Sequence, residues 1–225
     1  MSEVPEHVAG SPEQPIRVLI VDDHEVLAAS LAMVLDAEDD IRTAGVATTL
    51  EQARTLLEST LPDVILLDHR MPDGDGVAAI PELRALRPTI GVVVLTASAA
   101  DHVLMSAIEN GASGFLSKTR SLDEVTAAVR AAAAGESVIS PELLARLLPR
   151  FGRGKDTPED ELTDREREVL ALVAEGLSNA AIAERLVVSV HTVRNHIASL
   201  SAKLGAHSKL EALSVAVRQG MLPDL

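Results

Sequence analysis

Short apolar segments alternate with amphipathic segments from residue 16 to residue 135, and this alternation constrains the fold more than any other feature of the chain. In the amphipathic segments apolar residues recur every three or four positions, which is typical of helices. Strands that alternate with helices form a parallel sheet covered on both faces, so the sequence predicts an α/β fold. We expect strands at 16–21, 41–47, 63–67, 90–96 and 113–117, and helices at 25–37, 50–61, 77–86, 100–110 and 122–134.

The pattern changes after residue 135. Residues 136–160 end in a stretch rich in Gly, Pro and charged residues, which predicts a linker. Four helical segments and no strand follow, so we expect an all-α domain over 161–225, with helices at 163–175, 178–186, 190–204 and 208–219. Residues 1–15 are acidic and contain proline, and we expect a flexible N-terminal extension there.

Helix start signals agree with these boundaries. A Ser or Thr followed three residues later by Glu or Gln forms a capping box, in which two backbone amides at the helix start are satisfied. Such pairs begin at Thr49, Ser121, Thr163 and Ser208.

Composition limits the class of protein. Hydrophobic residues make up 47% of the chain, yet it has two Phe and no Trp or Tyr, so its core must be aliphatic. The absence of Cys excludes disulfides and thiolate metal sites. The N-terminus lacks the basic and apolar regions of a signal peptide, and no apolar stretch approaches the roughly 20 residues that cross a bilayer. We therefore expect a cytoplasmic protein without a membrane segment.

A net charge of −14 argues at first against a nucleic-acid partner. The charge is unevenly distributed, however, because residues 185–210 contain no Asp or Glu. This window holds four basic residues and three histidines, which makes it locally basic: Arg185, Arg194, Lys203, Lys209, His191, His196 and His207.

Polar side chains stand at the predicted ends of four strands. Asp22 and Asp23 follow the first strand, Asp68 follows the third, Thr96 ends the fourth and Lys118 follows the fifth. The carboxyl ends of parallel strands meet at one edge, where ligands bind near a switch in strand order. Converging carboxylates repel unless a cation lies among them, and Mg²⁺ prefers such oxygen ligands. A lysine and a hydroxyl suit a transferring phosphoryl group, for which Asp68 is a candidate nucleophile.

Each of these residues has a simpler explanation when it is taken alone. An Asp after a strand is most often a helix cap or a turn residue, and a Lys is most often a solvated surface residue. The occurrence of all the features at strand ends of one domain favours a shared site.

Residues 16–135 resemble the receiver domain of two-component response regulators, which has a flavodoxin-like (βα)5 fold. The motifs that carry the resemblance are VLIVDDHE (18–25), DVILLDHRMPDGDG (63–76), VVVLTAS (92–98) and GASGFLSK (111–118). The resemblance implies that Asp68 is the phosphoacceptor. It also implies that Asp22, Asp23, Asp68 and the backbone carbonyl of Arg70 surround Mg²⁺, with Asp23 as a direct ligand and Asp22 acting partly through water.

The same resemblance gives roles to three further residues. Lys118 would pair with the phosphoryl group, while Thr96 and Phe115 would form a switch pair in which the aromatic ring follows the threonine hydroxyl inward. Departures from the commonest pattern are His69, whose side chain we expect to point away from the metal, and Arg70, which could shield or bind the phosphoryl group. Thr119 stands where many receivers have proline, so a cis bond there is not assured.

The segment 190–204 has the pattern of a DNA-recognition helix. Its apolar residues follow spacings of three and four and predict a core face made of Val190, Val193, Ile197, Leu200 and Leu204. The opposite face is small, uncharged or basic, as a helix in the major groove requires.

Residues 162–213 resemble the C-terminal helix-turn-helix domain of the LuxR/NarL/FixJ type, LTDREREVLALVAEGLSNAAIAERLVVSVHTVRNHIASLSAKLGAHSKLEAL. Arg194 and Asn195 are the candidates for contacts to bases. The candidates for phosphate contacts are Ser189, Thr192, Lys203 and Lys209. The resemblance also suggests that the last helix, with apolar Leu210, Leu213 and Val217, forms a dimer contact.

Together these features predict a phosphorylation-controlled transcription regulator that is not an enzyme. A sensor histidine kinase would phosphorylate Asp68 in the presence of Mg²⁺ and thereby change homodimerisation and promoter DNA binding. One alternative is a phosphohydrolase with an Asp nucleophile, which Arg70 disfavours because such enzymes have an acid at that position. The other is a DNA-binding protein whose receiver is never phosphorylated.

Overall fold

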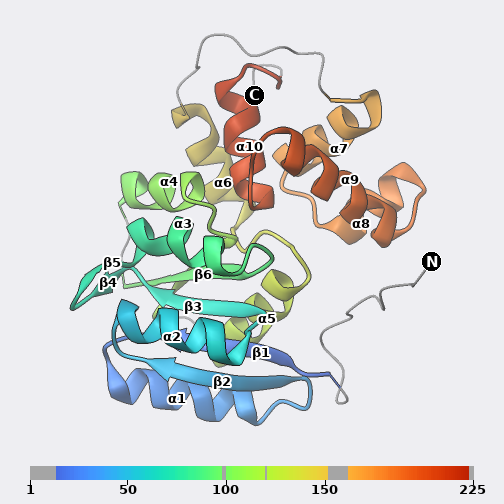
Figure 1. The fold of residues 1–225 in the computed structure, drawn as a ribbon. Coiled ribbons are helices and arrows are strands. Elements are labelled where there is room, and N and C mark those ends of the chain that lie inside the picture. Colours follow the sequence, from blue (N-terminus) through green and yellow to red (C-terminus); the bar gives the residue numbers. More distant parts are fainter. Residues whose placement is uncertain (1–13, 98–99, 120, 152–161, 223–225) are drawn as a thin grey trace.

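The structure is a computed structural model that describes residues 14–97, 100–119, 121–151 and 162–222 (Figure 1). The N-terminal part holds the expected five-stranded parallel sheet, with strand order β2-β1-β3-β6-β7. The predicted fold class is therefore confirmed. The strands are β1 (Ile16–Val21), β2 (Ile41–Ala47), β3 (Val64–Asp68), β6 (Gly91–Thr96) and β7 (Gly114–Ser117).

Helices cover both faces of this sheet (Figure 1). β3 is buried along its whole length, which explains why its sequence is continuously apolar instead of alternating. On one face lie α1 (Glu25–Asp36) and α5 (Leu122–Ala133), and on the other lie α2 (Leu50–Thr60), α3 (Gly76–Leu86) and α4 (Asp101–Glu109).

The helix caps agree with the sequence signals in most respects. The capping boxes at Ser121 and Thr163 are complete. At Thr49 and Ser208 only half of each box forms. There the hydroxyl caps the helix, but the side chain three residues later accepts from the amide one residue before the cap.

A small hairpin after β3 was not predicted. β4 (Arg70–Met71) pairs with β5 (Gly74–Asp75) in antiparallel fashion, directly beyond Asp68. Gly76 then begins α3 so close to the strand end that a Cβ atom would lie 2.1 Å from the carbonyl oxygen of Asp68. Only glycine permits this approach, so the start of α3 can pack directly against the backbone of Asp68.

The first residues of the predicted linker are docked on the sheet. The carbonyl of Val138 accepts from the amide of Phe115 at 2.8 Å, and its amide donates to the carbonyl of Ser113 at 2.9 Å. A Cβ atom on Gly114 would lie 2.1 Å from the Val138 carbonyl oxygen, so glycine is required here too. The linker therefore extends the edge of the sheet beside β7.

A short helix, α6 (Pro141–Leu147), and a 3-10 turn, η1 (Leu148–Arg150), complete the described part of the linker. Residues 152–160 of the predicted linker and 1–13 of the expected extension lie outside the described residues.

The helical domain has the four predicted helices, α7 (Asp164–Ala174), α8 (Asn179–Leu186), α9 (Val190–Lys203) and α10 (Lys209–Arg218). On α9, Val193, Ile197 and Leu200 are buried as expected, whereas Val190 is 37% exposed because it lies at the solvent-facing helix start. In the described part of the chain, no helix combines the length and the apolarity that a bilayer crossing requires.

The two domains share an apolar seam between α4 and α10 (Figure 1). Leu104 and Ile108 of α4 belong to the same buried cluster as Leu210 and Leu213 of α10. The face of α10 that the sequence suggested for a dimer contact is therefore covered by α4 of the same chain.

Polar contacts surround this seam. The guanidinium of Arg84 donates to the carbonyl of His207 at 2.8 Å, and the hydroxyl of Ser208 donates to the carbonyl of Ala112 at 2.9 Å. Burial lowers the pKa of Arg84 to about 10, although the negative charge of the nearby Glu211 acts in the opposite direction and raises it. Two ion pairs connect the helical domain to the receiver side, Arg218 with Glu109 and Lys209 with Glu136. Two more connect the linker to α4, where Arg146 and Arg150 both pair with Asp101.

The turn between α8 and α9 contains a strained residue that can be tested. Val187 has a φ of 55° and is 90% exposed. A β-branched residue in this left-handed conformation costs roughly 1–2 kcal/mol. Glycine removes this strain, but it also makes the unfolded chain more flexible, which offsets part of the gain in stability. We expect Val187→Gly to raise the free energy of unfolding by about 0.5 kcal/mol, measured by urea unfolding. A lower stability would contradict the strain.

Candidate functional site

Two buried carboxylates lie side by side at the carboxyl ends of β1 and β3. Val21 of β1 pairs with Leu67 of β3. The residues that follow them in the chain, Asp22 and Asp68, are therefore neighbours. Asp22 is 0% exposed and Asp68 is 3% exposed. The sheet thus places two anionic groups where burial disfavours charge and where mutual repulsion adds to that penalty.

Lys118, just beyond β7, neutralises this pair. Its ammonium lies 2.7 Å from Oδ2 of Asp22 and 2.6 Å from Oδ2 of Asp68. Burial opposes the charged form of the lysine, but hydrogen bonds to the two carboxylates outweigh it and raise the pKa of Lys118. The backbone holds the lysine in position, because its amide donates to the carbonyl of Thr96.

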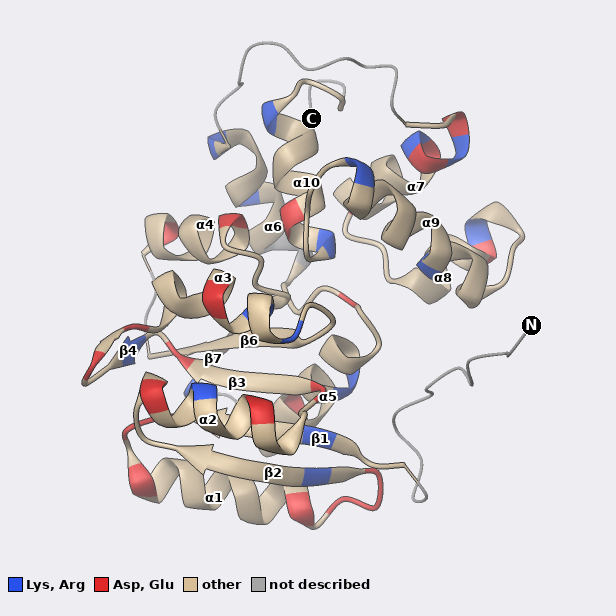
Figure 2. Ribbon diagram, viewed as in Figure 1, with Lys and Arg blue, Asp and Glu red and all other residues tan. Residues whose placement is uncertain are grey.

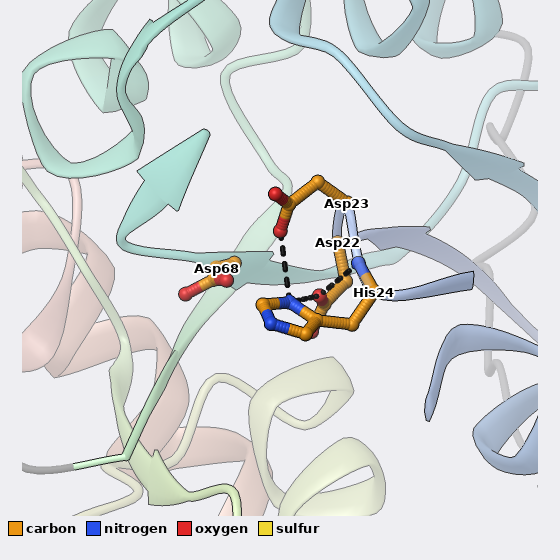
Figure 3. A group of neighbouring side chains, drawn as sticks. All are labelled: Asp22, Asp23, His24 and Asp68. Atoms are coloured by element: carbon orange, nitrogen blue, oxygen red, sulfur yellow. Dashed lines mark hydrogen bonds and ion pairs between the residues drawn. The ribbon is translucent and has the colours of Figure 1, made fainter. Parts of the chain in front are cut away.

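Asp23 and His24 complete an oxygen-rich group at the surface (Figure 3). Ligand atoms of Asp22, Asp23, His24 and Asp68 all lie within 4.8 Å of one another. His24 Nδ1 is 3.0 Å from Asp22 Oδ1 and 2.9 Å from Asp23 Oδ1. Sequence reasoning missed His24, although its position directly after two aspartates at a strand end was the available signal.

The residues that follow Asp68 border the site. The amide of Arg70 donates to Oδ1 of Asp68 at 3.3 Å, and the Arg70 side chain is exposed. His69 Nδ1 lies 3.4 Å from the same oxygen. His69 is not among the residues whose ligand atoms cluster around the possible metal position, so the expectation that its side chain points away from the metal stays a prediction.

Thr96 lies on β6, the strand next to β3, and Phe115 lies on β7, the strand beyond it. Thr96 is buried, and its hydroxyl has no hydrogen-bond partner among the described residues. Phe115 packs both against the sheet cluster beneath α2 and α3 and against the cluster that contains the α4–α10 seam. Because its amide also bonds Val138, Phe115 connects the sheet, the linker and the seam.

Four of the candidate DNA-contact residues lie at the cap or in the first half of α9, namely Ser189, Thr192, Arg194 and Asn195. Ser189 caps the helix by accepting from the amide of Thr192 at 3.0 Å, and Asn195 bonds the ring of His191 at 3.1 Å. The helix carries basic residues and no acidic one, whereas acidic residues are spread over the N-terminal domain (Figure 2). Arg194 is exposed on the side that faces a cleft between the domains.

Two lysines proposed for phosphate contacts are bonded within the protein. Lys203 binds Oε2 of the buried Glu166 at 2.7 Å, which ties α9 to the start of α7. Lys209 is 7% exposed, and its ammonium is within 3.3 Å of the carboxylate of Glu136.

Comparison with known families decides the identity. The model "Response regulator receiver domain" matches residues 18–130, and the model "Bacterial regulatory proteins, luxR family" matches residues 160–216. The chain belongs to the response-regulator family. This response regulator joins a receiver domain to a LuxR-type DNA-binding domain, as the sequence predicts, and the family consists of transcription regulators and not of enzymes.

Relatives match almost the full length of the response regulator. The response regulator protein VraR of Staphylococcus epidermidis is 34% identical over 92% of this chain and 99% of its own. The DNA-binding transcriptional activator DevR/DosR of Mycobacterium tuberculosis is 35% identical over 88% of this chain and 92% of its own. A solved structure of the RcsB response regulator of Salmonella typhimurium is 25% identical, with a TM-score of 0.53, over 88% of this chain and 96% of that one.

The Glu166–Lys203 pair predicts how the stability of the response regulator depends on pH. Although burial opposes ionisation, hydrogen bonds from Lys203, Ser199 and Thr163 outweigh it and lower the pKa of Glu166 to about 2. A depressed pKa stabilises the fold above the ordinary value near 4.5, and this contribution is lost as pH falls towards 2. At neutral pH we expect Glu166→Gln to lower the free energy of unfolding by roughly 1–3 kcal/mol.

The measurement is urea unfolding of both proteins over this pH range. The difference between wild type and Glu166→Gln should shrink as the solution becomes more acidic. The control is Glu168→Gln on the same helix, where the glutamate is exposed and forms an ion pair with Arg165. A difference that stays constant with pH would contradict the prediction.

Proposed function

We propose that Asp68 of this response regulator accepts a phosphoryl group from a sensor histidine kinase and that the modification controls DNA binding. The observation that carries the proposal is the ammonium of Lys118, which bonds Asp22 and Asp68 at 2.7 and 2.6 Å. A buried carboxylate at a strand end, beside a lysine and a second carboxylate, has the groups that phosphoryl transfer needs.

In the transfer step an oxygen of Asp68 attacks phosphorus. The bond from phosphorus to the histidine nitrogen of the kinase breaks, the bonding pair stays with that nitrogen, and an acyl phosphate forms on Asp68. Lys118 then exchanges its bond to the carboxylate for a bond to a phosphoryl oxygen, and the hydroxyl of Thr96 donates to another. The unpartnered Thr96 hydroxyl supports this role, because a buried hydroxyl without an acceptor gains from a new one.

The residues present fit Mg²⁺. Asp22, Asp23, Asp68 and the backbone carbonyl of Arg70 would hold it, since carboxylate and carbonyl oxygens are the ligands that this ion prefers. When bound, it neutralises negative charge on the phosphoryl oxygens. Lys118 bonds Oδ2 of Asp22 and of Asp68, so its positive charge and that of the ion would compete for the same pair of carboxylates.

The response reaches the DNA-binding domain through the switch pair Thr96 and Phe115. When the Thr96 hydroxyl moves towards the phosphoryl group, the ring of Phe115 follows into the space that it leaves. That movement disturbs the packing of the α4–α10 seam and the bonds to Val138, because Phe115 contacts both. Separation of α4 from α10 exposes the α10 face for homodimerisation.

DNA binding uses the helical domain, 161–225, while residues 16–135 form the receiver and 136–160 the linker. Arg194 and Asn195 contact bases of promoter DNA, and Ser189 and Thr192 at the start of α9 contact phosphates. Lys203 contacts a phosphate when its ammonium leaves the carboxylate of Glu166.

Asp68→Asn tests the phosphoacceptor. We expect wild type, incubated with a small phosphodonor and Mg²⁺, to gain one phosphoryl adduct by intact mass spectrometry and Asp68→Asn to gain none, because an amide cannot form an acyl phosphate. The matched control is Asp75→Asn, since Asn also caps helices and Asp75 caps α3 nearby. An adduct on Asp68→Asn, or none on wild type, would exclude the proposal.

Lys118→Gln tests the competition between lysine and metal. Removal of the ammonium leaves Asp22 and Asp68 without a counter-charge, so we expect Mg²⁺ to bind about tenfold more tightly while phosphorylation slows. Calorimetric titration with Mg²⁺ measures the first effect and intact mass over time measures the second. Asp22→Asn should instead weaken Mg²⁺ binding. Equal or weaker Mg²⁺ affinity in Lys118→Gln would contradict the competition.

A further inference from the structure

Glu136, in the linker just after α5, bonds two groups of the helical domain. Its Oε1 accepts from the backbone amide of Asn179 at 2.9 Å, and its Oε2 lies 3.3 Å from Nζ of Lys209. Asn179 is the first residue of α8, and Lys209 is the first residue of α10. One carboxylate from the receiver side therefore satisfies a helix start and a buried ammonium at once.

The helical domain itself holds Lys209 in this position. The other two bonds of the ammonium go to the carbonyl of Leu177 and to Oδ1 of Asn179, both at 3.0 Å. An ammonium has three donors, so only the bond to Glu136 comes from outside the domain. Asn179 is the first residue of α8, and the side chain of Ser178 caps that helix from within the domain. The lysine and the amide therefore remain aimed at the same point when the receiver withdraws.

This point borders the DNA-contact face of α9. A cleft of about 360 Å³ between the domains is lined by Asn179 and Lys209 together with Arg194 and Ser201 of α9, and by Glu136 and Arg84 from the receiver side. A duplex that lies against Arg194 brings its phosphate backbone to the neighbouring surface, where helix starts and lysines bind phosphates.

We infer that the Asn179 amide and the Lys209 ammonium form a phosphate-binding site for the DNA backbone, and that the carboxylate of Glu136 occupies it while the domains are docked. The inference rests on the proposed DNA binding and adds a residue-level competition to it. The site already binds an anionic oxygen group in this structure, namely the Glu136 carboxylate, so its preference for anions does not depend on the helix start alone. A phosphate offers the same acceptor oxygens with the same sign of charge.

The test measures binding of the full chain to a labelled random-sequence duplex by fluorescence anisotropy at several salt concentrations. A random duplex suffices because phosphate contacts do not depend on sequence. Without phosphodonor, Glu136→Gln should bind about fivefold more tightly than wild type, since the competing charge is gone. With phosphodonor and Mg²⁺ the difference should disappear, because the carboxylate has already left the site.

With phosphodonor and Mg²⁺, Lys209→Gln should bind the duplex more weakly than wild type and reduce the slope of log K against log salt by about 1, as expected for one lost phosphate contact. Lys209→Gln alone leaves the Glu136 carboxylate without its partner and can destabilise the fold. The double variant Glu136→Gln, Lys209→Gln removes both charges of the pair and therefore allows the same measurement on a folded protein. It should lose the fivefold gain and retain the smaller slope.

The matched control is Glu109→Gln, which removes another ion pair of the seam, to Arg218, away from the cleft. It should leave the salt slope unchanged and tighten binding less than Glu136→Gln. Equal tightening by the two variants, or a wild-type slope in the Lys209 variants, would overturn the inference and leave the proposed function intact. Failure of every protein to bind the duplex, with phosphodonor included, would instead overturn the proposed function and the inference with it.

Discussion

Two carboxylates buried at neighbouring strand ends create the constraint on which the rest of the receiver depends. The register of β1 and β3 places Asp22 beside Asp68, and the covered faces of the sheet keep water away from them. Such a pair is stable only with positive charge nearby, and Lys118 supplies it here. The same arrangement couples Lys118 to Asp68, because a change of charge at Asp68 changes the strength of the bond from the Lys118 ammonium.

In the proposed function, the fold converts that local change into a change between domains. Phe115 lies on β7, which β6 separates from the strand that carries Asp68, yet it packs against the cluster that contains the α4–α10 seam and bonds the linker at Val138. Packed cores respond to such displacements by adopting a second arrangement and not by gradual deformation. Docking through α10 also covers the surface that a dimer would use, so separation of the domains and pairing of two chains are linked.

Much of this could be predicted from sequence. The strands, helices and strand-end residues follow from local periodicity and from the geometry of parallel sheets, and both domains carry long motifs. His24 and the hairpin after β3 were missed, because their positions depend on how the turn folds back. The contacts of Lys209 with Glu136 and of Lys203 with Glu166 could not be predicted, since an isolated basic residue gives no indication of which distant acid it will meet. The α4–α10 seam was missed for the same reason: an apolar helix face does not specify its partner.

The central claim is that phosphorylation of Asp68 separates α10 from α4. The chain has no Cys, so cysteines introduced in place of the exposed Val26 on α1 and Glu184 on α8 can be spin-labelled without other changes. Pulsed electron-spin distance measurement should give one narrow distribution without phosphodonor and a longer or broader one with phosphodonor and Mg²⁺, while Asp68→Asn stays narrow in both conditions. Identical distributions for the wild-type background in the two conditions would contradict the account.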